Sequence, residues 1–135
     1  PDGSLWNIAI RDPNEPDKYM AAIRLEDSAV ITSGGYERYF EENGIIYHHI
    51  LDPRTGKPSE SGLKSVSIIS KDGTLADALS TSLFIMGEEK AAKYWKENGS
   101  NFDILLMTND NRLLVSAGIK DKVISDNYKI EVINK

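Results

Sequence analysis

Two helical patterns follow one another in the middle of the chain with almost no sequence between them. The first has an apolar stripe at spacings of four, four and three, formed by Leu75, Leu79, Leu83 and Met86. Thr74 is its predicted N-cap and Gly87 its predicted C-terminal stop. A second helix is expected over residues 88–98, with Ala91 and Trp95 facing inward. Two helices in direct succession exclude a fold in which strands and helices alternate.

Strand-like patterns lie on both sides of this helical pair. We expect strands over residues 6–10, 19–24, 28–33, 45–51, 65–70, 102–107, 112–117 and 128–132. Residues 36–42 fit no firm pattern. The order predicts an α+β fold, in which a mostly antiparallel sheet carries both helices on one face. No repeat or linker divides the sequence, so residues 1–135 are expected to form a single domain.

The composition excludes several classes of function. Sixteen basic and 21 acidic residues give a net charge of −5, which repels phosphate backbones, so no nucleic-acid partner is expected. The chain has no cysteine, which excludes disulfides, thiol nucleophiles and thiolate zinc sites. No apolar run approaches the length that spans a bilayer.

The chain has only two histidines, His48 and His49, and they are adjacent. Neighbouring residues of a strand point to opposite faces, so these two cannot bind one metal and only one of them faces a given site. Spacing alone favours one histidine in a polar contact of the core and one in solvent over a catalytic role for either.

Asp77 and Thr81 lie four residues apart on the first predicted helix, opposite its apolar stripe. A carboxylate and a hydroxyl are hard oxygen ligands that suit Mg²⁺, although water and substrate phosphates would have to complete the site. Alternatively, Thr74 and Asp77 have the spacing of a capping box. Three hydroxyl residues at 80–82 are poor helix formers and weaken the capping alternative, but spacing leaves both open.

Two loops with glycine follow predicted strands, Ser33-Gly34-Gly35-Tyr36 and Asp52-Pro53-Arg54-Thr55-Gly56. Their backbone N–H groups are suited to an anionic ligand. Ordinary turns are the more common explanation of such loops.

Four stretches occur together in one order: WNIAIRDP at 6–13, SGGYERYF at 33–40, HILDPRTGKP at 49–58 and ADALST at 76–81. The combination resembles the ApbE-type FAD:protein FMN transferases of bacteria. The HxxDPxTGxP and ADxxxT patterns are part of this resemblance, which covers nearly the whole chain. The expected fold is therefore the C-terminal portion of an ApbE-like fold.

The resemblance implies an enzyme that binds FAD with Mg²⁺ and cleaves its pyrophosphate. FMN passes to a threonine hydroxyl of an acceptor protein, and AMP leaves. Asp77 and Thr81 are the implied metal ligands, and His49 is the implied catalytic residue that accepts the hydroxyl proton. The implied nucleotide pocket contains Ser33, Gly34, Tyr36, His49, Asp52, Thr55 and Gly56.

The resemblance also implies that an N-terminal half, with a further metal ligand and much of the flavin pocket, lies outside this sequence. We therefore expect the chain to be inactive on its own. The family implies an extracytoplasmic location, as a periplasmic or cell-surface lipoprotein whose N-terminal lipid anchor is not in this sequence. Three alternatives remain: an FAD pyrophosphatase that gives FMN and AMP, a non-catalytic flavin-binding module, and an interaction domain without a ligand.

Overall fold

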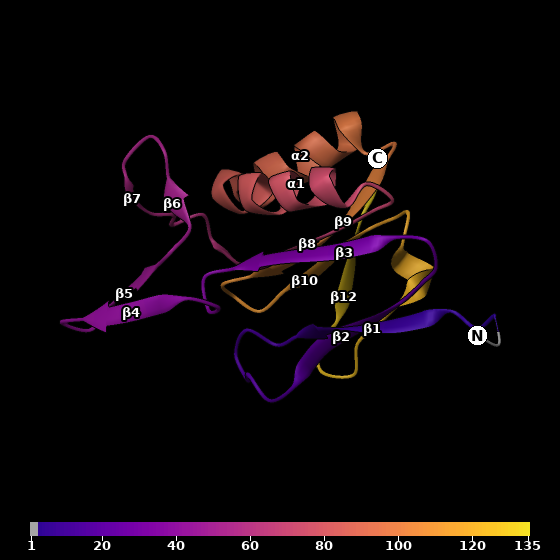
Figure 1. Ribbon diagram of the computed structural model, residues 1–135, viewed down its shortest axis with the longest axis horizontal. Helices are drawn as coiled ribbons and strands as arrows, with labels where there is room; N and C mark the ends of the chain where they lie inside the picture. The colour runs from indigo at the N-terminus through magenta and orange to yellow at the C-terminus, as the bar shows by residue number, and fades with distance from the viewer. Residues whose placement is uncertain (1–2) are drawn as a thin grey trace.

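The computed structural model describes residues 3–135, and its elements stack in three layers (Figure 1). The central layer is a five-stranded sheet of β3 (Ala29–Gly34), β8 (Leu63–Ser70), β9 (Phe102–Thr108), β10 (Leu113–Ser116) and β12 (Ile130–Ile133). Their order is β12-β10-β9-β8-β3, and every pair is antiparallel except β10 with β12. The two outer layers are a helical pair, α1 (Gly73–Met86) and α2 (Glu88–Asn98), and a three-stranded sheet of β1 (Trp6–Arg11), β2 (Tyr19–Leu25) and β11 (Val123–Ile124).

Each face of the central sheet has its own hydrophobic core. On β9, Ile104 and Leu106 belong to the core beneath the helices, which also buries Trp95. The intervening Leu105 and Met107 belong to the core shared with β1 and β2. Since alternate residues of a strand face opposite sides, burial on both faces requires an uninterrupted apolar run, and β9 has one.

The predicted α+β class and the packing of both helices on one face are confirmed. The sequence patterns do not predict the smaller sheet on the other face. Its strand β11 has two residues and follows a three-residue 3-10 helix, η1 (Lys120–Lys122), so neither is long enough to form a periodic pattern. The last strand covers 130–133 rather than 128–132, and Tyr128 lies outside it.

The first helix begins earlier than the sequence predicts. Asp72 is its N-cap, and the Asp72 carboxylate accepts hydrogen bonds from the N–H groups of Thr74 and Leu75, both at 3.0 Å. The prediction of Thr74 as N-cap is therefore wrong, because aspartate is the better capping residue. Gly87 ends the helix as predicted, with φ at +83° and its N–H donating to the Leu83 carbonyl at 3.2 Å. No helix in the described part of the chain is long and apolar enough to cross a bilayer.

Two hairpins extend from one end of the layers (Figure 1). The first pairs β4 (Tyr39–Glu42) with β5 (Ile45–His48), and the second pairs β6 (Leu51–Asp52) with β7 (Lys57–Pro58). The single strand expected over 45–51 is therefore wrong, since it is broken at residues 49–50, between β5 and β6. Ile50 lies buried in this break, and its carbonyl accepts a hydrogen bond from the Ser59 N–H at 2.9 Å.

Candidate functional site

The Ser33 hydroxyl joins β3 to α1. It lies 2.8 Å from the Ser80 hydroxyl and 3.0 Å from the Thr81 hydroxyl. Ser80 is buried and also donates to the Asp77 carbonyl at 2.9 Å. These contacts explain hydroxyl residues inside a helix, since two of them bond to the neighbouring strand. The structure thus brings together Ser33, predicted to bind the nucleotide, and Thr81, predicted to bind the metal.

Asp77 lies one helical turn before Thr81, and both residues are exposed. The capping alternative for Asp77 is wrong, because the Thr74 N–H that it would cap donates to Asp72 instead. Within the described residues, no group of three or more His, Asp or Glu side chains is placed to hold a metal. The donors present are one carboxylate and neighbouring hydroxyls. This set fits Mg²⁺ when water and phosphate oxygens complete its coordination.

Gly34 allows the backbone of β3 to pass close to the Tyr36 ring. A Cβ at Gly34 would overlap that ring and would lie 3.0 Å from the Lys64 carbonyl oxygen. Burial raises the pKa of the Tyr36 hydroxyl above its ordinary value of 10.0.

Asp52 organises the turn between β6 and β7. Its carboxylate accepts hydrogen bonds from the Arg54 guanidinium at 2.6 and 3.0 Å and from the Arg54 N–H at 2.9 Å. These bonds lower the pKa of Asp52 to about 2, and the bonds from the Arg54 side chain contribute more than the bond from its backbone N–H. The Asp52 carbonyl accepts from the N–H groups of Thr55 and Gly56 at 3.1 and 2.8 Å. Gly56 has φ at +68°, a backbone conformation that favours glycine.

The same turn lines a cavity of about 510 Å³. Asp52 and Thr55 lie in its wall, and Arg54 and Lys57 lie beside them. The two cationic side chains suit an anionic ligand such as a phosphate, although Arg54 is paired with Asp52 and Glu60 lies in the same wall. Sequence reasoning missed both cations, because they occupy variable positions of the HxxDPxTGxP pattern.

His48 and His49 lie in different surroundings, as predicted, although β5 ends at His48 and His49 lies outside the strand on which the prediction relied. The half-buried His48 ring meets Phe84 edge-on at 5.8 Å, and its Nε2 lies 3.1 Å from the Ser59 carbonyl oxygen. His49 is exposed, and its Nδ1 lies 3.1 Å from the Arg38 carbonyl oxygen. A carbonyl only accepts, so each of these nitrogens carries hydrogen, and in a neutral ring the other nitrogen is then the acceptor. The acceptor Nδ1 of His48 is buried without a hydrogen-bond partner in the described structure, whereas the acceptor Nε2 of His49 sits on an exposed side chain.

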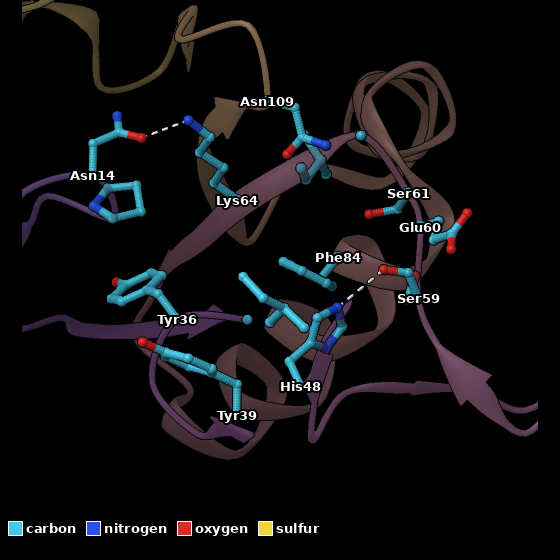
Figure 2. Close-up of a pocket in the computed structure, with 15 residues that line it drawn as sticks. Asn14, Tyr36, Tyr39, His48, Ser59, Glu60, Ser61, Lys64, Phe84 and Asn109 are labelled. Atoms are coloured by element: carbon cyan, nitrogen blue, oxygen red, sulfur yellow. Dashed lines mark hydrogen bonds between the residues drawn. The ribbon is translucent and has the colours of Figure 1, made fainter. Parts of the chain in front are cut away.

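A larger cavity of about 700 Å³ lies beside His48 (Figure 2). Of the predicted site residues, only Tyr36 lines it. Figure 2 shows Lys64 on another side of the cavity, with its ammonium group bonded to Asn14 at 2.5 Å. The two cavities share a wall at residues 59–61.

The structure thus distributes the predicted residues over separate places. Ser33 and Thr81 are in contact, whereas Asp52 and Thr55 belong to the smaller cavity. His49 and Asp77 line neither cavity. Sequence reasoning also missed Lys64, which is an isolated lysine at a strand position and belongs to no motif.

Comparisons with known proteins identify similar chains. The model of a family described as the ApbE family matches residues 1–106. The FAD:protein FMN transferase of Treponema pallidum is 44% identical over 119 residues, which cover 87% of this chain and 33% of that protein. The FAD:protein FMN transferase of Vibrio cholerae is 37% identical over 110 residues, which cover 81% of this chain and 33% of that protein.

Solved structures give the same result. The crystal structure of the ApbE protein from Thermotoga maritima matches with a TM-score of 0.79 and 39% identity, over 88% of this chain and 38% of that one. The flavin transferase ApbE from Vibrio cholerae matches with a TM-score of 0.73 and 32% identity. The chain therefore has the fold of a portion of these proteins. It spans about a third of the length of the curated relatives it matches, which is less than the half expected from the sequence.

Proposed function

Because this chain belongs to the ApbE family, we propose that it forms part of an FAD:protein FMN transferase. The curated relatives described above carry that name. In the proposed reaction, the hydroxyl oxygen of an acceptor threonine attacks the phosphorus in the FMN half of the FAD pyrophosphate. The bond from that phosphorus to the bridging oxygen breaks. AMP leaves, and the threonine holds FMN through a phosphodiester.

The observation that carries this proposal is the arrangement of His49. Its Nδ1–H donates to the Arg38 carbonyl at 3.1 Å, and its Nε2 remains available on an exposed side chain. A neutral imidazole in this state can accept the proton that the threonine hydroxyl loses as the new phosphorus–oxygen bond forms. His48 is less suited to this role, because its free nitrogen is buried.

The remaining residues bind and position the nucleotide in this proposal. Those assigned to the nucleotide are Ser33, Gly34, Tyr36, His49, Asp52, Thr55 and Gly56. Arg54 and Lys57 add positive charge for the pyrophosphate in a chain that is otherwise acidic. When bound by Asp77 and Thr81, Mg²⁺ would supply further charge neutralisation at the phosphates. A short set of residues is sufficient, because phosphoryl transfer depends mainly on positioning and electrostatics.

Hydrolysis of FAD is the second candidate function. The exposure of His49 favours it, because water reaches the same nitrogen that a threonine hydroxyl would use. The products would be FMN and AMP, without a flavin adduct on protein. Covalent flavin on an acceptor therefore distinguishes the transferase from the hydrolase.

We also propose an extracytoplasmic location, as a periplasmic or cell-surface lipoprotein. This proposal rests on the family resemblance alone, since a cysteine-free sequence is compatible with an oxidising and with a reducing compartment. Fractionation of cells, followed by detection with an antibody against this chain, tests it. Detection in the cytosol alone would contradict it.

A chimera tests the proposed reaction. This chain replaces the matching segment of the Treponema pallidum relative, which supplies the other two thirds of the fold. The chimera should release AMP from FAD in the presence of Mg²⁺ and attach FMN to a threonine of an added acceptor. The same chimera with His49→Ala should bind FAD and release AMP much more slowly. A folded chimera that binds FAD and releases no AMP would contradict the proposal.

A further inference from the structure

The larger cavity opens beside the β4–β5 hairpin, whose strands pair only with each other in the described structure. Tyr39 and Ile46 line the cavity, although they are 58% and 57% exposed. The register of the hairpin places them on one face with His48. A two-stranded hairpin with exposed apolar side chains and free edges is a surface to which an extended polypeptide can add.

Lys64 supplies an ammonium group at the cavity wall. Its Nζ donates to the side-chain oxygens of Asn14 and Asn111 at 2.5 and 2.8 Å, which leaves one of its three hydrogens for another acceptor. None of the ion pairs of the described residues includes Lys64. Asn14 is itself fixed, because it donates to the Tyr128 hydroxyl, which donates to the buried Asp12 carboxylate at 2.7 Å. The ammonium group is therefore held in place without an anionic partner.

The cavity adjoins the residues proposed to carry the reaction. Tyr36 in its wall follows closely after Ser33 and Gly34 in the chain. Phe84 in its wall lies about one helical turn after Thr81 on α1. A segment bound in the cavity would therefore lie against the same loop and the same helix as the Ser33–Thr81 contact.

We propose that this cavity binds an extended segment of the acceptor protein, with an acidic side chain of that segment on Lys64. The inference rests on the proposed function and adds the place and the charge preference of the protein substrate. A pyrophosphate fits less well, because the wall of this cavity has one cationic side chain, Lys64, whereas the smaller cavity has two, Arg54 and Lys57. Glu60 lies in the wall of both cavities, and the smaller one also holds Asp52, the ion-pair partner of Arg54.

Short labelled peptides that contain one threonine test this inference. They are made in pairs: one peptide has Asp at a position near the threonine, and its partner has Asn at the same position. Binding of the peptides to the chimera described above is measured by fluorescence anisotropy, and FAD binding by flavin fluorescence. The best Asp peptide should bind about tenfold more tightly than its Asn partner. Lys64→Gln should remove this preference without changing the affinity for FAD. Lys71→Gln is the matched control, since the Lys71 side chain is 81% exposed and lies outside the cavity, and it should keep the preference.

Two adjacent isoleucines supply a second, independent comparison. Ile45 and Ile46 are 55% and 57% exposed, but they point to opposite faces of β5 and only Ile46 lines the cavity. Ile46→Ser should weaken peptide binding about tenfold, and Ile45→Ser should leave it unchanged.

The outcomes separate this inference from the function on which it rests. Peptides that show no preference for Asp, or equal losses in the two isoleucine variants, would overturn it. A parallel loss of FAD and peptide affinity in Lys64→Gln would also overturn it, because the cavity would then belong to the nucleotide site. Absence of FAD binding to the unsubstituted chimera, with the Asp preference intact, would contradict the proposed function instead.

Discussion

The Ser33 hydroxyl on β3 lies 3.0 Å from the Thr81 hydroxyl on α1. This contact connects an edge strand of the central sheet to the helix that packs on it. It also joins a residue assigned to nucleotide binding with one assigned to metal binding. A substitution of Ser33 should therefore affect both the stability of the fold and the binding of FAD.

Ser33→Ala should lower the free energy of unfolding by about 1–2 kcal/mol, because the buried Ser80 hydroxyl loses a partner. It should also weaken Mg²⁺-dependent FAD binding. Chemical denaturation and FAD titration measure the two effects. Ser82→Ala is the control, since the exposed Ser82 hydroxyl bonds within its own helix, to the Ala78 carbonyl. Equal effects of the two substitutions would contradict a special role for the Ser33 contact.

Two aspartates near the start of α1 have different expected roles. Asp72 caps the helix, and Asp77 is assigned to the proposed metal site. Asp72→Ala should cost about 1 kcal/mol of stability, because it removes the N-cap of α1. Asp77→Ala should leave stability within about 0.5 kcal/mol, because it removes an exposed side chain. Denaturation curves of both variants check this difference, and the reverse order would restore the capping role of Asp77.

The periodic elements of this chain could be predicted from its sequence, because their patterns are local. The stripe of Leu75, Leu79 and Leu83 predicted α1, and all three residues pack in the core beneath the helices. The prediction of Thr74 as N-cap was wrong, because threonine and aspartate can both cap a helix and the local pattern does not show which of two nearby residues does so.

The contacts that assemble the candidate site could not be predicted from local patterns. Ser33 and Thr81 are separated by 48 residues, so their contact depends on how α1 packs on the sheet. Lys64 faces the larger cavity from a strand rich in apolar residues, and no motif includes it. The break in the strand at His49 has no sequence pattern of its own, because apolar residues continue on both sides.

The stability of the β6–β7 turn should depend on pH through Asp52. Its pKa of about 2 in the folded chain lies below the ordinary value of 3.8, because Arg54 donates hydrogen bonds to it. Because the pKa of Asp52 is lower in the folded chain than in the unfolded chain, the ionised carboxylate stabilises the fold. This stabilisation is present above about pH 4 and is lost as the pH falls toward about 2. Asp52→Asn lacks this stabilisation, so the difference in Tm between the two chains should shrink over that range. A difference in Tm that stays constant from neutral pH to about pH 2 would contradict this assignment.

The two histidines should respond differently to substitution. In the chimera, His49→Ala should slow AMP release more than it weakens FAD binding, because the free Nε2 accepts a proton only during the reaction. His48→Ala should slow the reaction less. It should instead lower stability, since His48 packs edge-on against Phe84 and bonds to the Ser59 carbonyl. Steady-state rates, FAD affinities and melting curves of both variants measure these effects. A larger rate loss for His48→Ala than for His49→Ala would show that the assignment of His49 as the proton acceptor is wrong.

The central claim is that this chain holds a nucleotide site that depends on a metal ion. Titration of FAD into the chimera, in which the Treponema pallidum relative supplies the rest of the fold, tests it most directly, with flavin fluorescence recorded in Mg²⁺ and then in EDTA. The same titration is made on Asp77→Ala. We predict saturable binding that requires Mg²⁺ and that is lost in Asp77→Ala. Absence of binding, or binding that neither EDTA nor Asp77→Ala changes, would contradict the claim.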